Sequence, residues 1–240
     1  MKRIFTLFAL IFVLISCNNS NTSKILENKV NKQDSIVIKN IFNTVLTNGQ
    51  SYQWLDYLSN EIGGRLSGSH ESIAAILWGE RLMQDLRFDK VWLQDVMVPN
   101  WYRGEKEEAN FTSNTVKYNV PICALGGSIP TPTTGITGEV IEVQSLEDIE
   151  SLGEKLRGKI VFFNRPFDNT HIQTFKAYGG CVNQRYAGAM VCGKFGALAA
   201  IVRSMTSSID DYPHTGAMSY GDIPENEKVP TAAISTKAAN

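Results

Sequence analysis

No part of the sequence concentrates charge of one sign. The 240 residues include 23 Lys and Arg against 24 Asp and Glu, which leaves a formal net charge of −1. Proteins that bind nucleic acids normally carry a basic patch that neutralises phosphates, and no basic block stands out here. We therefore expect no nucleic acid among the partners.

The sequence also lacks an apolar run long enough to span a bilayer, which takes about 20 residues. Its longest such run, "IFTLFALIFVLI", follows the charged "MKR" and precedes "SC", which predicts a secretory signal over residues 1–17. The end of this signal, "LISC", resembles a bacterial lipobox, which implies cleavage before Cys17 and a lipid anchor on its thiol. The alternative is an ordinary signal peptide with an incidental cysteine. The polar residues 18–34 fit a tether, so we expect an exported lipoprotein of the bacterial cell envelope, periplasmic or attached to the outer membrane.

Cysteine is scarce after the signal, where only Cys123, Cys181 and Cys192 remain. An odd number in an exported chain argues against a disulfide framework, and no C-x-x-C spacing suggests a structural zinc. We expect these three side chains to act as small apolar residues of a core.

Histidine is equally scarce, with three residues. His70, His171 and His214 are far apart, none is in H-E-x-x-H spacing, and no carboxylates cluster with them. A catalytic zinc needs three protein ligands and an open position for water. The sequence therefore contains no recognisable set of zinc ligands.

Nucleotide-binding loops are absent as well. The segment "GGRLSGSH", residues 63–70, has neither the Lys-Ser/Thr of a Walker loop nor the Gly-x-Gly-x-x-Gly of a dinucleotide loop. It lies between two helical patterns, the first beginning with Ser51 as N-cap and ending at Gly63 and Gly64. We expect Ser69 to cap the second.

The apolar residues that are present, 43% of the chain, suffice for a sizeable core. Residues 35–47 have helical spacing, and "KVWLQDVMVP", residues 90–99, alternates like a strand. Between them, the helix after Ser69 carries one apolar stripe, formed by Ile73, Ile76, Leu77, Met83 and Leu86.

The pattern changes near Tyr118. Two helical segments, "SLEDIESLGEKL" and roughly residues 182–195, alternate with short apolar runs, namely "KYNVPICAL", "GITGEVIEV", "KIVFFN", "ALAAIVRS" and "VPTAAIS". This alternation predicts an α/β or mixed α+β unit distinct from the helical start. We expect one domain over residues 35–117 and another over 118–240.

Taken in order, several motifs resemble one family. "EIGGRLSGSHESIAAILWGERLMQDLRFDKVWLQDVMVPNWYRGEKE" is similar to the opening of the catalytic domain of co-catalytic zinc exopeptidases, in particular the carboxypeptidase Q (plasma glutamate carboxypeptidase) branch. "RGKIVFFNRP", "GKFGALAAIVRS", "PHTG" and "VPTAAIS" resemble its inserted protease-associated domain. The resemblance runs from about Ser51 to the last residue.

The resemblance implies an α/β peptidase domain that binds two zinc ions through His, Asp and Glu, with a carboxylate as general base on a metal-bridging water. Its substrates are short peptides cut at a terminus. In that family the zinc ligands follow the protease-associated domain, so none can be assigned to this chain. The implied fold is a helical lead-in followed by a mixed α+β protease-associated domain that is truncated at its C-terminal end. We expect the complete enzyme to use two zinc ions, and this segment to bind none and to contain no catalytic residue.

The residues that could contact substrate are Arg65, Ser67 and His214. Arg65 and Ser67 lie in the loop that resembles the active-site rim, where a guanidinium could hold a substrate carboxylate. The alternative is that Arg65 pairs with a structural carboxylate and that Ser67 and Ser69 cap a helix. His214, in "YPHTG", is either a substrate contact or a satisfied loop histidine. The aromatic pair in "NWYRGEKEE" is either a peptide platform or part of a domain connection.

Two hypotheses follow. The first is the N-terminal portion of an exported zinc exopeptidase that hydrolyses short peptides or dipeptides. The second is a lipid-anchored binding module built on a protease-associated domain without peptidase activity. The expected partners are a short peptide, the membrane through Cys17, and a second copy of the chain as a homodimer.

Overall fold

The computed structural model describes residues 20–240, and the side chains from residue 31 onward. The predicted signal peptide and Cys17 lie outside the described residues. The chain forms two compact units: one combines the residues up to Arg65 with His70–Gln94, and the other combines Leu66–Ser69 with Asp95–Asn240. The expected domain boundary near Tyr118 stays a prediction, because compact units need not coincide with an inserted domain.

Within residues 20–94, the first unit contains the α-helices α2 (Ser20–Asn48), α3 (Ser51–Asp56) and α4 (His70–Asp85). Helix α2 begins well before residue 35, so most of the segment expected as a polar tether is helical. Polarity alone does not prevent a helix, and no Gly or Pro interrupts residues 20–48. None of the helices among the described residues is long and apolar enough to cross a membrane.

The glycine-rich segment ends one helix and precedes the next, as predicted. Helix α3 continues into a π-helical segment, Tyr57–Ile62, which ends at Gly63 with a φ of 82°. Glycine adopts this left-handed conformation without the strain that a side chain would impose. Ser51 is the first helical residue and not the N-cap, which is Gln50. Helix α4 begins directly after Ser69.

The predicted strand over residues 90–99 is not formed. Residues 90–108 contain neither helix nor strand. A strand needs a neighbour to pair its backbone N–H and C=O groups, and none of the strands among residues 20–240 pairs with this segment. The alternating pattern is thus present without the partner that would make it a strand.

The second unit begins with a β-hairpin. Strand β1 (Ala109–Ser113) pairs antiparallel with β2 (Val116–Val120), and Phe111 stacks on Tyr118 with ring centroids 4.9 Å apart. The turn residues Asn114 and Thr115 both have positive φ, as tight hairpin turns require. The sequence pattern predicted β2 but not β1.

A five-stranded mixed sheet follows, in the order β3-β7-β6-β5-β4. The strands β4, β5, β6 and β7 run parallel, and β3 pairs antiparallel with β7. Their bounds are β3 (Ile122–Ala124), β4 (Glu139–Val143), β5 (Lys159–Phe163), β6 (Ala199–Arg203) and β7 (Thr231–Ile234). Each lies within one of the predicted apolar runs, so the expected α/β character is confirmed.

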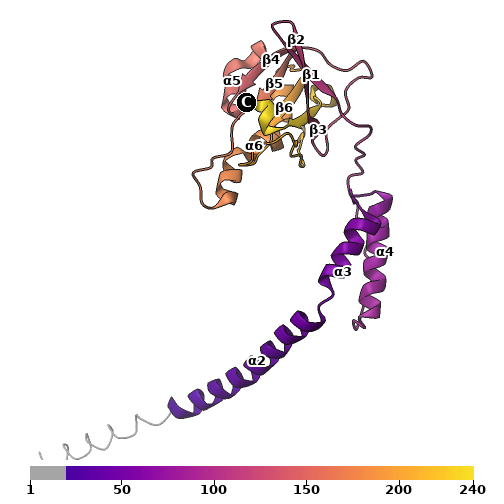
Figure 1. Ribbon diagram of the computed structural model, residues 1–240, viewed down its shortest axis with the longest axis vertical. Helices are drawn as coiled ribbons and strands as arrows, with labels where there is room; N and C mark the ends of the chain where they lie inside the picture. Colours follow the sequence, from indigo (N-terminus) through magenta and orange to yellow (C-terminus); the bar gives the residue numbers. More distant parts are fainter. Residues whose placement is uncertain (1–19) are drawn as a thin grey trace, which may run out of the picture. The chain divides into compact units, whose positions relative to one another are not determined.

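Two helices connect the parallel strands. Helix α5 (Leu146–Leu152) leads from β4 to β5, and α6 (Thr174–Gly193) leads from β5 to β6. Right-handed crossovers in one direction place both on the same face of the sheet, where they contact each other (Figure 1). The core between these helices and the sheet includes Val161, Phe163, Ala189, Cys192 and Val202. A short helix, α7 (Thr236–Ala239), follows β7 with Ser235 as its N-cap.

Candidate functional site

The carboxyl ends of the parallel strands gather polar residues at one edge of the sheet. We call this the carboxyl edge: Gln144 after β4, Asn164 and Arg165 after β5, Arg203 and Ser204 at the end of β6, and Ser235 after β7. Loops at this edge of α/β sheets commonly bind ligands because the rigid strands fix their position. The carboxyl edge is therefore a candidate ligand site.

Arg203 is the most unusual residue of the carboxyl edge, because only 9% of its surface is exposed. Its Nη1 donates to Asn164 Oδ1 at 3.2 Å and its Nη2 to Asn240 Oδ1 at 2.9 Å. Both acceptors are neutral amides, and no carboxylate among residues 31–240 forms an ion pair with Arg203. Burial lowers the pKa of the guanidinium. A buried charge without an opposite charge is costly, so this arrangement requires an explanation.

The orientation of Asn164 is fixed by its other neighbour. Its Nδ2 donates to Glu142 Oε1 at 2.8 Å, and Gln144 Nε2 donates to the same oxygen at 2.8 Å. The amide oxygen of Asn164 is thereby turned toward Arg203. Glu142 is thus linked to Arg203 through an amide and makes no direct contact with it.

The loop that carries His214 is held against the same edge. The backbone N–H of His214 donates to Ser204 Oγ at 2.7 Å, and that hydroxyl donates to the carbonyl of Ile234 at 2.6 Å. Further along, Thr215 Oγ1 donates to the carbonyl of Ala124 at 2.7 Å. The His214 side chain remains exposed. The backbone of the loop is therefore well fixed while its imidazole is accessible.

Gly216 allows close packing behind this loop. A Cβ at this position would lie 2.7 Å from Cζ of Arg185, so the guanidinium packs directly on the glycine backbone. Arg185 also donates to the hydroxyl of Tyr178 and lies over its ring, 5.4 Å from the centroid. A side chain at position 216 would therefore require the guanidinium of Arg185 to move.

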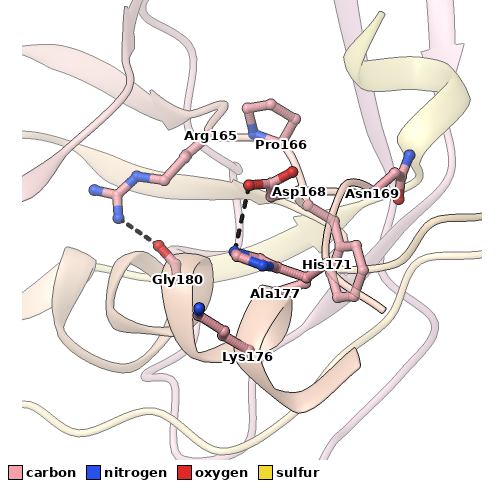
Figure 2. Close-up of a pocket in the computed structure, with 9 residues that line it drawn as sticks. Arg165, Pro166, Asp168, Asn169, His171, Lys176, Ala177 and Gly180 are labelled. Atoms are coloured by element: carbon pink, nitrogen blue, oxygen red, sulfur yellow. Dashed lines mark hydrogen bonds and ion pairs between the residues drawn. The ribbon is translucent and has the colours of Figure 1, made fainter. Parts of the chain in front are cut away.

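Beside the carboxyl edge lies a pocket of about 450 Å³, formed by residues 165–169, His171 and the first turns of α6 (Figure 2). Asp168 Oδ2 lies 3.5 Å from Nε2 of His171, and its other oxygen accepts hydrogen bonds from the Thr170 hydroxyl and N–H. The hydrogen bond from the Thr170 hydroxyl, followed by the one from its backbone N–H, makes the largest contribution to lowering the pKa of Asp168. Arg165 donates to the carbonyls of Gln144 and Gly180 and so supports the pocket wall.

The predicted rim residues make local contacts. Arg65 donates to the carbonyls of Leu58 and Gly63, the latter at 2.6 Å, and so satisfies the end of its own π-helical segment. No structural carboxylate pairs with it among the described residues. Ser67 Oγ donates to the carbonyl of Pro99 at 2.7 Å. These contacts favour structural roles, and the suggested substrate contacts stay predictions.

The "NWYRGEKEE" segment attaches to strand β3, at the opposite end of the sheet from β4. The carboxylate of Glu107 accepts a hydrogen bond from the N–H of Ala124 at 2.9 Å, and Arg103 donates to the carbonyl of Ala124 at 2.9 Å. Arg103 and Glu107 also pair with each other at 3.0 Å. Burial alone would raise the pKa of Glu107, but the bonds from Ala124 and Arg103 outweigh it and the pKa is lowered. Arg103 and Glu107 thus bond the backbone N–H and C=O of Ala124, which lies in the edge strand β3.

The cysteines form no disulfide among the described residues. Cys181 and Cys192 are buried, as expected for small apolar residues, and Cys123 is half-buried. Burial raises the pKa of Cys192 to about 12, so its thiol stays protonated. No group of three or more His, Cys, Asp or Glu side chains within residues 31–240 could hold a metal ion. The described residues therefore do not fit the two-zinc site that the resemblance implies.

Sequence reasoning singled out His214, whose role stays a prediction, and did not single out Arg203, Asn164 or Asn240. The available signal was a polar residue directly after each apolar run, as in "KIVFFNR" and "ALAAIVRS". Only strand register shows that Asn164 and Arg203 end neighbouring strands.

Comparison with known proteins shows similarity to carboxypeptidase Q and to an M28 peptidase. No family model matches the sequence. Carboxypeptidase Q of Xenopus laevis is 38% identical over 191 residues, which cover 79% of this chain and 38% of the frog protein. Human carboxypeptidase Q is 38% identical over 192 residues, with the same shares of each chain. The crystal structure of a peptidase M28 precursor from Shewanella amazonensis SB2B matches with a TM-score of 0.78 and 29% identity, over 87% of this chain and 46% of that chain. The chain thus spans less than half the length of these relatives.

Proposed function

Because the chain is related to carboxypeptidase Q and to an M28 peptidase, we propose that it is part of an exported, zinc-dependent exopeptidase that hydrolyses short peptides or dipeptides. The observation that carries this proposal is sequence identity of 38% over 79% of the chain, together with a structural match of TM-score 0.78. In this proposal the first unit belongs to the peptidase domain, and the five-stranded sheet is the core of an inserted protease-associated domain.

The exposed apolar face of α4 supports the proposal. Ile73, Ile76, Leu77, Met83 and Leu86 are all largely exposed, and Ile76 leaves 54% of its surface uncovered. Trp92 and Leu93, which lie with Ile76 and Met83 along one groove, belong to the segment expected as a strand. Apolar faces of this size are normally covered by another part of the protein. The rest of the peptidase domain would cover α4 and supply a pairing partner for residues 90–99.

The metal site belongs elsewhere in this proposal. The ligands of the two zinc ions and the general base would lie in the region that corresponds to the part of the relatives that this chain does not span. The residues of this chain would instead support and bind the peptide, with His214 as the best placed of the predicted contacts. Its backbone is fixed by Ser204 and its imidazole is exposed.

A binding module without peptidase activity is the second candidate. The observation that favours it is that the second unit has its own closed core, in which Leu125, Val161, Phe163 and Val202 are fully buried. In this case the lipid-anchored chain would bind peptides without cutting them. It leaves the apolar face of α4 unexplained.

One experiment distinguishes the two candidates. The full-length gene product is expressed beside a segment of residues 18–240, and zinc content and amino-acid release from a dipeptide panel are measured. We expect two zinc ions per chain and chelator-sensitive hydrolysis for the full-length protein, and neither for the segment. A full-length protein without zinc or hydrolysis would refute the enzyme. A segment with tightly held zinc and turnover would refute the placement of the ligands outside this chain.

A further inference from the structure

We propose that Arg203 and Asn164 form a carboxylate-binding site at the carboxyl edge of the sheet. The carboxylate comes either from the free C-terminus of a bound peptide or from an acidic side chain elsewhere in the same polypeptide. The first source rests on the proposed peptidase function, and the second does not.

The need for an anion follows from the burial of Arg203. Its surface is 9% exposed, yet its two hydrogen-bond acceptors, Asn164 Oδ1 and Asn240 Oδ1, carry no charge. Its side-chain hydrogen bonds among residues 31–240 are these two, and none of its nitrogen atoms is both fully buried and without a partner. Arginine is the side chain best suited to buried ion pairs because its planar fork matches a carboxylate in bidentate fashion.

The local charges favour an anion. Arg165, which follows β5, donates to the carbonyls of Gln144 and Gly180 and to Asn183 Oδ1, which are all neutral acceptors. No carboxylate among residues 31–240 forms an ion pair with Arg165 or with Arg203. The guanidinium of Arg165 is held by the carbonyls of its own surroundings, so Arg203 is the one that we assign to the carboxylate.

The surroundings also suit a ligand that enters from the edge. Arg203 is followed directly by Ser204, whose hydroxyl fixes the backbone of the His214 loop. Asn164 is held by Glu142, so its amide oxygen cannot turn away from the guanidinium without losing a hydrogen bond. The cation is thus held rigidly beside an exposed loop.

The test uses the full-length protein and a matched pair of probes, 4-phenylbutanoate and 4-phenylbutanamide, whose affinities are measured by calorimetry. For a peptide-derived carboxylate, Arg203→Met weakens binding of the acid by about ten- to hundred-fold and leaves that of the amide unchanged, as expected for a lost charged hydrogen bond. The control is Arg157→Met, an exposed arginine paired with Glu154, which changes neither affinity.

A second variant keeps Arg203 in place in case Arg203→Met does not fold. Asn164→Asp combined with Glu142→Gln puts a carboxylate beside the guanidinium and retains a donor for it. For a peptide-derived carboxylate, this variant also loses preferential binding of the acid, because the site is already filled.

For an internal carboxylate the results differ. Wild type and Arg203→Met then bind the two probes alike, but Arg203→Met has a lower melting temperature at pH 8 than Arg157→Met. The deficit shrinks toward pH 5 as the orphaned carboxylate takes up a proton. Probe affinities and melting temperatures that are unaffected by Arg203→Met at both pH values would overturn the site. Absence of zinc and hydrolysis would refute only the proposed peptidase.

Discussion

At the scale of single residues, close packing of α6 on the sheet depends on Gly188. A Cβ at this position would lie 2.8 Å from Cε2 of the buried Phe163. We expect Gly188→Ala to destabilise the protein by about 1–3 kcal/mol, because one of the two packed groups must shift. The measurement is the free energy of unfolding in denaturant.

Gly179 in the same helix is the matched control. A Cβ there would meet nothing within 4 Å, so Gly179→Ala gains only the higher helix propensity of alanine. It is expected to stabilise by about 0.5–1 kcal/mol. Equal effects of the two substitutions would contradict the packing argument.

At the scale of an element, α5 is defined by a capping box. Ser145 Oγ accepts the N–H of Asp148 at 3.1 Å, and Asp148 Oδ2 accepts the N–H groups of Ser145 and Gln144 at 2.9 and 2.8 Å. We expect Ser145→Ala to cost about 1 kcal/mol of stability, since the first turn loses an acceptor. Thermal unfolding measures it, with the exposed Ser151→Ala as a control that should have little effect.

The pH dependence of this cap has a definite sign. The hydrogen bonds from the backbone of Gln144 and Ser145 lower the pKa of Asp148 below its usual value. A carboxyl whose folded pKa is lowered stabilises the fold above its unfolded pKa, and this contribution is lost as the pH falls through the folded pKa. The difference between Asp148→Asn and wild type should therefore shrink in acid. A difference that is constant down to pH 2 would show that Asp148 does not act as an anion.

At the scale of the whole molecule, the open question is attachment to a membrane. The sequence "LISC" predicts that the mature protein begins at a lipidated Cys17. We expect the full-length protein to enter the detergent phase in a phase-partitioning assay and Cys17→Ala to remain in the aqueous phase. Wild type and variant together in the aqueous phase would exclude the anchor.

Local patterns of the sequence by themselves determined much of the fold. Apolar runs located β2 to β7, and Gly63 ended a helix. These features depend on a residue and its near neighbours, so they can be read without knowing the fold. A local apolar pattern was not sufficient for residues 90–99, because a strand also needs a partner. It also failed to predict β1, whose residues pair only through the hairpin.

Only the tertiary structure decided the carboxyl edge. Arg203 and Asn164 are far apart in the sequence, and each follows an ordinary apolar run. They meet because β5 and β6 pair in parallel, with Phe163 opposite Val202, so that the next residue of each strand emerges at the same edge. Burial of the guanidinium depends on this pairing and on the chain after β7, which brings Asn240 to it. The charge of Arg203 is a property of the sequence, but its lack of a counter-charge arises from three separate segments packed together.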